Sequence, residues 1–166
     1  TLSKLCGEGS KSVPKIDLIA PALPTVARLI LYEDKELFEH AFSILQIMQR
    51  SGAAAVDEFL KIVPLEHLVQ LMSSDEGLSV EWLPFVQFLG NVVATQDSKR
   101  IIHAGILPHW RNMLFHPDPR FRAEACLSIS NVLLEPHCRA KVFAFEDIIP
   151  RVVELMKVKA FATTAR

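Results

Sequence analysis

The sequence has few cysteines, no excess of charge and no long apolar run, and these shortages exclude several classes of protein. The three cysteines, Cys6, Cys126 and Cys138, form no Cys-x-x-Cys pair and leave one thiol over, which argues against a disulfide-stabilised secreted domain and predicts free thiols. Lys and Arg number 18 against 19 Asp and Glu, which argues against a general nucleic-acid or membrane binder. Apolar runs such as 19–23 are far shorter than the roughly 20 residues of a membrane-spanning helix.

Motifs of enzymes, metal sites and secretion are also missing. No Gly-x-Ser-x-Gly, glycine-rich phosphate loop or His-Glu-x-x-His occurs. The histidines and cysteines lack zinc-ligand spacing, and the adjacent His137 and Cys138 would point in different directions on any regular element. Residues 1–15 show neither the apolar core nor the small-residue cleavage site of a secretory signal. We therefore expect a soluble, intracellular protein that is not an enzyme and needs no metal or cofactor.

Half of the residues are apolar, and their order along the chain contains an internal repeat. The segments LPTVARLI, LEHLVQLM, LPHWRNML and IPRVVELM begin at Leu23, Leu65, Leu107 and Ile149, so each follows the last by 42 residues. Apolar residues within each segment recur at i, i+3 and i+4, the spacing of one face of a helix. We predict four equivalent helices, with Trp110 in the core because it falls in one of the apolar columns.

A polar turn follows each of these helices, and a longer apolar stretch follows the first three. A shorter helix is predicted before the second, third and fourth. The predicted turns are YEDKE at 32–36, SSDEG at 73–77, HPDPR at 116–120 and KVKAF at 157–161. The long helices are predicted from Leu37, Val80 and Arg122, and the short ones from Val56, Lys99 and Arg139. Small residues in the long helices, among them Gly90 and Ser128, would let neighbouring helices approach closely.

Three helices in a repeat of about 42 residues predict an all-α, armadillo-repeat solenoid, a right-handed superhelix in which every repeat packs on its neighbours. As one domain over 1–166, the pattern gives the end of one repeat at 1–12, complete repeats at 13–52, 53–96 and 97–136, and a partial repeat at 137–166. Both ends of the chain fall inside the pattern. We therefore expect a segment of a longer solenoid.

Four motifs make a family resemblance specific. They are TLSKLC at 1–6, PALPTVARLI at 21–30, FLGNVVATQDSKRIIHAGILPHW at 88–110 and FRAEACLSISNVL at 121–133. In this order they are similar to helix segments in the armadillo repeats of the importin-alpha (karyopherin-alpha) family. The chain resembles the middle to C-terminal repeats of that family, most weakly between residues 42 and 83.

The resemblance implies a nuclear import adaptor that holds basic nuclear localisation signals of cargo proteins in a concave groove lined by third helices. In the family, tryptophan rings stack on lysine stems, asparagine amides bind the peptide backbone, and acidic residues bind the cationic heads. The family also recruits importin-beta through a basic N-terminal arm, which is not among these 166 residues. No nucleic acid or membrane is expected as a partner, and the implied location is the cytoplasm and nucleus.

The ladder of binding positions known from the family is only partly kept. The asparagine positions read Lys4, Ile47, Asn91 and Asn131, and the tryptophan positions read Ser43, Gln87 and Leu127. Acidic positions are matched by Asp97 and Glu124, and Ser130 lies beside them. The implied peptide-binding residues are Gln87, Asn91, Asp97, Glu124, Leu127, Ser130 and Asn131. Because no tryptophan remains, we expect weak binding of a basic peptide.

Plainer roles compete with this interpretation. Asn91 and Asn131 could be packing asparagines that bond a neighbouring carbonyl, and Asp97 and Glu124 could be solvated surface acids. Trp82, near the start of a long helix, is expected to pack in the core. The alternative function is an armadillo scaffold that binds a protein partner without recognising nuclear signals.

Overall fold

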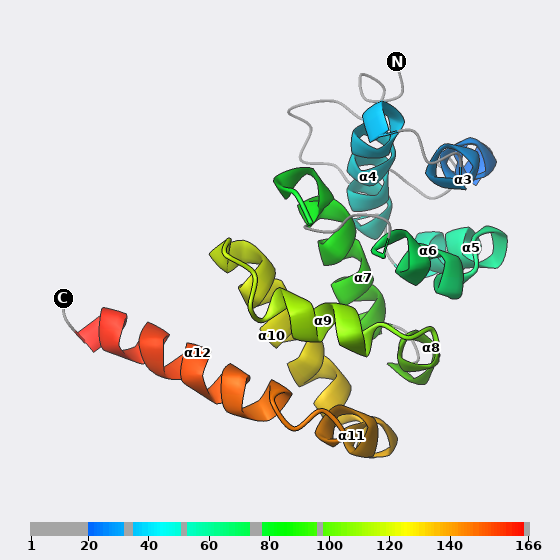
Figure 1. Ribbon diagram of the computed structural model, residues 1–166. Helices are drawn as coiled ribbons and strands as arrows, with labels where there is room; N and C mark the ends of the chain where they lie inside the picture. Colours follow the sequence, from blue (N-terminus) through cyan, green and yellow to red (C-terminus); the bar gives the residue numbers. More distant parts are fainter. Residues whose placement is uncertain (1–19, 32–34, 51–52, 74–77, 96–97, 165–166) are drawn as a thin grey trace.

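The structure is a computed structural model that describes residues 20–31, 35–50, 53–73, 78–95 and 98–164 (Figure 1). Within these ranges every regular element is helical, from the short turn η1 (Ala20–Ala22) onward. None of the described helices is both long enough and apolar enough to cross a bilayer. The predicted repeat end at 1–12 and the candidate residue Asp97 lie outside the described residues.

The helices follow the predicted three-part order. The second helices of the repeats are α3 (Leu23–Leu31), α6 (Leu65–Leu71), α9 (Leu107–Met113) and the start of α12 (Ile148–Thr164). The third helices are α4 (Lys35–Arg50), α7 (Leu83–Thr95) and α10 (Pro119–Leu134). The first helices are α5 (Ala53–Ile62), α8 (Ser98–His103) and α11 (Pro136–Phe143). The predicted all-α helical-repeat solenoid is thus confirmed, whereas the proposed repeat boundaries stay a prediction.

Helix boundaries differ from the prediction in two informative places. The long helix expected from Val80 begins as the 3-10 turn η2 (Val80–Trp82), because in a continuous α-helix the ring of Pro84 would clash with the carbonyl of Val80. The turn predicted at 157–161 was wrong, since α12 continues to Thr164. The segment KVKAF lacks the glycine of SSDEG and the prolines of HPDPR, so nothing in it ends a helix.

The third helices α4, α7 and α10 lie side by side in one layer, and shorter helices flank that layer (Figure 1). Aromatic rings fill the contact between α4 and α7. Phe42 and Phe85 stack with their ring centroids 4.7 Å apart, and Trp82 lies 5.4 Å from Phe42. Trp82 and Trp110 are both buried, which confirms their predicted place in the core.

Helices α7 and α10 approach closely at Gly90 and Ser128, as their small side chains predict. A Cβ atom at Gly90 would lie 2.7 Å from Ser128 Oγ, which is closer than a van der Waals contact allows. Ser128 is fully buried, and its hydroxyl has no hydrogen-bond partner among the described residues. The spacing of these two helices therefore depends on the missing side chain of Gly90.

A histidine joins the start of α10 to the preceding repeat. His116 Nδ1 accepts the N–H of Asp118 at 3.0 Å, so Nε2 carries the hydrogen and donates to the carbonyl oxygen of Leu78 at 3.0 Å. Asp118 in turn caps α10, because its Oδ1 accepts the backbone N–H of Arg120 at 2.8 Å. The hydrogen bonds from the side chain and backbone of Arg120 lower the pKa of the Asp118 carboxyl to about 2.

Candidate functional site

A chain of side-chain hydrogen bonds joins the three third helices. Gln46 Nε2 on α4 donates to Gln87 Oε1 on α7 at 3.2 Å, and Gln87 Nε2 donates to Glu124 Oε1 on α10 at 3.1 Å. The amide of Gln87 thus uses its carbonyl toward one neighbour and its NH₂ group toward the other. All three side chains, which we call the polar ladder, are half-buried, so solvent or a ligand can reach them.

Glu124 carries the charge of the polar ladder. No Lys, Arg or His of the described residues forms an ion pair with its carboxylate. Its Oε1 atom accepts from Gln87, and Oε2 has no hydrogen-bond donor in the part of the chain that the structure describes. A carboxylate in this state can bind an incoming ammonium or guanidinium group through a charge-assisted hydrogen bond.

Two asparagines lie close to the polar ladder along the same helices. Asn131 on α10 is half-buried, and its amide makes no hydrogen bond with any described residue, which argues against a packing role. Asn91 on α7 is exposed. An amide side chain offers both a donor and an acceptor, as an extended peptide backbone requires.

Leu127 and Ser130 complete the candidate residues on α10. Leu127 is 53% exposed and lies one turn before Asn131. Its aliphatic side chain can pack against the methylene stem of a lysine or arginine, but it offers no cation–π attraction. Ser130 Oγ donates to the carbonyl oxygen of Leu127 at 2.7 Å, so the hydroxyl hydrogen is already used within the helix.

The structure brings some of the predicted site residues together. Gln87 and Glu124 are hydrogen-bonded, and Leu127, Ser130 and Asn131 share α10 with Glu124. The placement of Asp97 beside them stays a prediction, because Asp97 is outside the described residues.

Sequence reasoning missed Gln46. The family positions on α4 were read at Ser43 and Ile47, and Gln46 lies between them. Its distance of 41 residues from Gln87, close to the repeat length, was the signal that could have revealed it.

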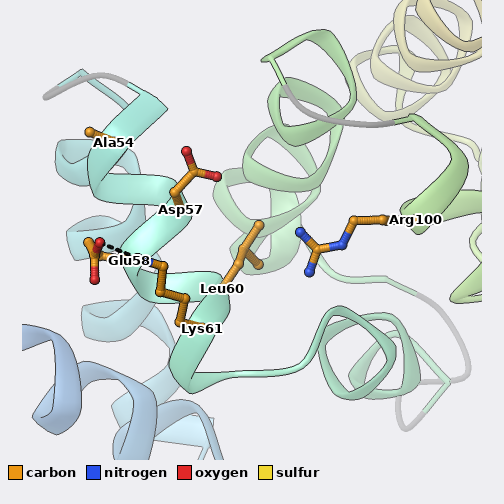
Figure 2. A pocket seen from close by; sticks show the side chains of 6 residues that line it. All are labelled: Ala54, Asp57, Glu58, Leu60, Lys61 and Arg100. Carbon is orange, nitrogen blue, oxygen red and sulfur yellow. Dashed lines mark hydrogen bonds and ion pairs between the residues drawn. The ribbon is translucent and has the colours of Figure 1, made fainter.

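A shallow cavity of about 290 Å³ lies between α5 and α8 (Figure 2). Its lining residues are Ala54, Asp57, Glu58, Leu60, Lys61 and Arg100. Lys61 Nζ lies 2.5 Å from Glu58 Oε1, and this hydrogen bond raises the pKa of Lys61. The lining thus mixes acids and bases without a thiol or imidazole, so it offers no set of soft metal ligands.

A serine just after the end of α6 lies close to a histidine in the first turn of α9. Ser73 Oγ and His109 Nε2 are 3.4 Å apart, and burial lowers the pKa of the His109 imidazole. No carboxylate among the described residues binds the other ring nitrogen, so the third group that orients a catalytic base is missing there. In the same part of the chain, no three His, Cys, Asp or Glu side chains converge as metal ligands.

The sequence comparison points to a known protein. No family model matches this chain. The chain is 30% identical over 134 residues to importin subunit alpha-7 of Arabidopsis thaliana, and the match covers 76% of this chain and 24% of that protein. The chain thus spans about a quarter of the length of this curated relative. The similarity supports the resemblance to importin-alpha over the part of the chain that it covers.

The structural comparison concerns the fold. The crystal structure of an engineered protein superposes with a TM-score of 0.67 at 22% sequence identity, and the match covers 78% of this chain and 55% of that one. At this identity the likeness shows the fold alone. The sequence similarity to an importin-alpha subunit favours an armadillo-type helical-repeat scaffold.

Proposed function

We propose that this chain is part of a nuclear import adaptor of the importin-alpha type, which holds the basic nuclear localisation signal of a cargo protein along the polar ladder. The observation that carries this proposal is Glu124, a half-buried carboxylate without a described cationic partner at the end of a row of hydrogen-bonded side chains. The similarity to an importin-alpha subunit supports it independently. One armadillo domain over 1–166, acting in the cytoplasm and nucleus, belongs to the same proposal.

Each part of a basic peptide has a counterpart on this face. The amide of Asn131 is available to the peptide backbone, and the exposed Asn91 on the neighbouring helix belongs to the same proposed site. A lysine or arginine head binds Oε2 of Glu124, while its methylene stem packs on Leu127. Asp97 and Ser130 complete the proposed site.

Affinity is expected to be modest. A ring under a cation contributes about 0.5–2 kcal/mol, so each missing tryptophan weakens binding by about two- to thirty-fold. Importin-beta is proposed as a partner of the whole adaptor through a basic arm that is not among these 166 residues.

The test is a low-salt titration of the chain with fluorescent one-cluster and two-cluster basic signal peptides and a scrambled peptide of equal charge. We expect preference for the true signals, with weakening as salt rises. Glu124→Gln keeps an oxygen for the Gln87 bond and removes the charge, so it should reduce affinity about ten-fold. Glu146→Gln, at an exposed acid of the turn before α12, is the matched control and should change nothing.

The exposed Leu127 favours the alternative function, because an aliphatic side chain at this place suits an apolar residue of a partner better than a cation. Equal binding of true and scrambled signals, unaffected by Glu124→Gln, would contradict the adaptor. It would leave an armadillo scaffold whose protein partner is recognised by other chemistry.

A further inference from the structure

The polar ladder has a fixed direction of hydrogen bonding. Gln87 Nε2 donates to Glu124 Oε1 at 3.1 Å, because an ionised carboxylate can only accept hydrogen bonds. The carbonyl oxygen of the same amide then faces α4, where Gln46 Nε2 donates to it at 3.2 Å. The charge of Glu124 therefore determines how the two amides are turned, and Gln46 holds Gln87 in the orientation that binds Glu124.

The two oxygens of the Glu124 carboxylate differ in what surrounds them. Oε1 is engaged by Gln87, whereas Oε2 has no hydrogen-bond donor among the described residues. A Cβ atom at Gly90 would lie 3.9 Å from Oε2, so this oxygen is close to α7 at a residue that has no side chain to cover it. One oxygen of the carboxylate is thus left for a ligand.

Lysine and arginine heads make different demands on a carboxylate. The guanidinium fork binds most strongly when two parallel N–H groups reach both oxygens. An ammonium is a compact charge whose N–H groups can each bind a single oxygen. A fork at Glu124 would have to share Oε1 with Gln87 or displace its amide, while an ammonium at Oε2 leaves the polar ladder intact.

We propose that Gln87 makes the site at Glu124 selective for lysine over arginine, an inference that rests on the proposed function of binding a basic signal peptide. Gln87 acts on the ligand through Glu124, and Gln46 supports it, so both glutamines are positioning residues. The exposed Leu127 fits this choice, because its aliphatic side chain can pack on a lysine stem but gives a planar guanidinium no ring to stack on. The ligand is thus a basic segment with lysine at the position that meets Glu124.

The test compares two fluorescent signal peptides that differ only in having lysine or arginine at every basic position, each beside a scrambled peptide of equal charge. The chain should bind the lysine peptide about three-fold or more tightly. Gln87→Leu frees Oε1, so the arginine peptide should gain about three- to ten-fold while the lysine peptide changes by less than about two-fold. Gln46→Leu should produce part of this gain. Gln70→Leu, at an exposed glutamine of α6, is the matched control and should leave the ratio of the two affinities unchanged.

A second readout follows the hydrogen bond itself. The side-chain NH₂ signals of Gln87 in a ¹⁵N–¹H NMR spectrum report its bond to Glu124, and their absence in Gln87→Leu identifies them. We expect a small shift when the lysine peptide is added and a larger one with the arginine peptide, because only the fork competes for Oε1. A purely structural role of Gln87 would lower the melting temperature in Gln87→Leu without changing the ratio of the two affinities, and this result would contradict the inference.

Equal or tighter binding of the arginine peptide would overturn the inference, as would a ratio that Gln87→Leu leaves unchanged while circular dichroism melts show a folded variant. If both peptides still bind better than their scrambled versions and Glu124→Gln still weakens them, the proposed function stands without the selectivity. Binding of both peptides no better than the scrambled ones would instead contradict the proposed function, and this inference with it.

Discussion

At the scale of single residues, Gly90 sets how closely α7 and α10 approach. Gly90→Ala places a methyl group 2.7 Å from Ser128 Oγ. Overpacking costs about 1–3 kcal/mol, and the gain in helix propensity is about 1 kcal/mol, so we expect the free energy of unfolding to fall by about 1 kcal/mol. Urea denaturation followed by circular dichroism measures it.

Ser128→Ala provides the control, because it removes the oxygen that the new methyl group would meet. The lone Ser128→Ala variant should be neutral or more stable by up to about 1 kcal/mol, since the hydroxyl is buried without a partner. In this background Gly90→Ala should become stabilising. If Gly90→Ala destabilises both backgrounds equally, the contact with Ser128 is not the cause.

A ring at position 127 tests the chemistry of the proposed peptide site. Leu127 is half exposed and can be enlarged without disturbing the core. Leu127→Trp should increase affinity for a lysine-containing signal peptide about two- to thirty-fold, because a tryptophan face attracts a cation by about 0.5–2 kcal/mol. Fluorescence titration measures the change, with Ile62→Trp on α5 as the control. Unchanged affinity in Leu127→Trp would place the peptide elsewhere.

The role of a residue could be predicted when it depends on local sequence, and not when it depends on a residue far away in the chain. Trp110 was predicted as core because its column is apolar in every repeat, and burial follows from helix periodicity alone. Gln46 was missed because its role depends on a side chain 41 residues away, and no local pattern encodes that bond. The ligand-facing role proposed for Asn131 likewise depends on a partner outside the chain.

At the scale of elements, the start of α10 depends on the charge of Asp118. In the folded protein its pKa is about 2 against an ordinary value of 3.8, so the carboxylate stabilises the fold above the ordinary value and this contribution is lost as pH falls toward 2. Asp118→Ala should therefore lower the melting temperature at pH 7, and the difference from wild type should shrink between pH 5 and 2. Thermal melts across this range measure it.

Asp118→Asn is the matched control for the cap. Asparagine can cap a helix without charge, so its difference from wild type should be smaller at pH 7 than that of Asp118→Ala. A gap between wild type and Asp118→Ala that stays constant down to pH 2 would contradict the assignment of the capping bond to the carboxylate.

Helix ends could be predicted at three of the four expected turns. SSDEG and HPDPR contain glycine or proline and YEDKE contains neither, and the helices before them end at Leu71, Met113 and Leu31. KVKAF also contains neither, and its expected turn rested only on the repeat length. A repeat length alone does not end a helix, and α12 continues to Thr164.

At the scale of the whole molecule, the local stability of each repeat should depend on its contacts with the adjacent repeats. Phe85 is fully buried and stacks on Phe42 between α4 and α7. Phe85→Ala should lower the free energy of unfolding by about 3–5 kcal/mol. Because each repeat contacts only its neighbours, amide hydrogen exchange should speed up most in α4 and α7 and least in α11 and α12. Mass spectrometry of peptide fragments measures this profile.

Val142→Ala on α11 is the matched variant in a later repeat, and its expected exchange profile is the opposite of that of Phe85→Ala. Val142 is also fully buried, so exchange should then rise most in α10 and α11. Equal acceleration everywhere in both variants would show a single cooperative unit in place of neighbour-by-neighbour stability. The fold itself was predictable from the 42-residue period, because a repeated amphipathic unit can bury its apolar face only by stacking.

The polar ladder has a mechanical consequence. Pulling the ends of the stack apart separates α4, α7 and α10 where the Gln46–Gln87 and Gln87–Glu124 bonds span them. A hydrogen bond at 3.1–3.2 Å is lost after a further separation of about 0.5 Å, while the aromatic contacts beneath still touch. Water can replace these half-exposed bonds, and they can form again when tension ends. The polar ladder can therefore open and form again under tension, so the spacing of α4, α7 and α10 can change reversibly without disturbing the core.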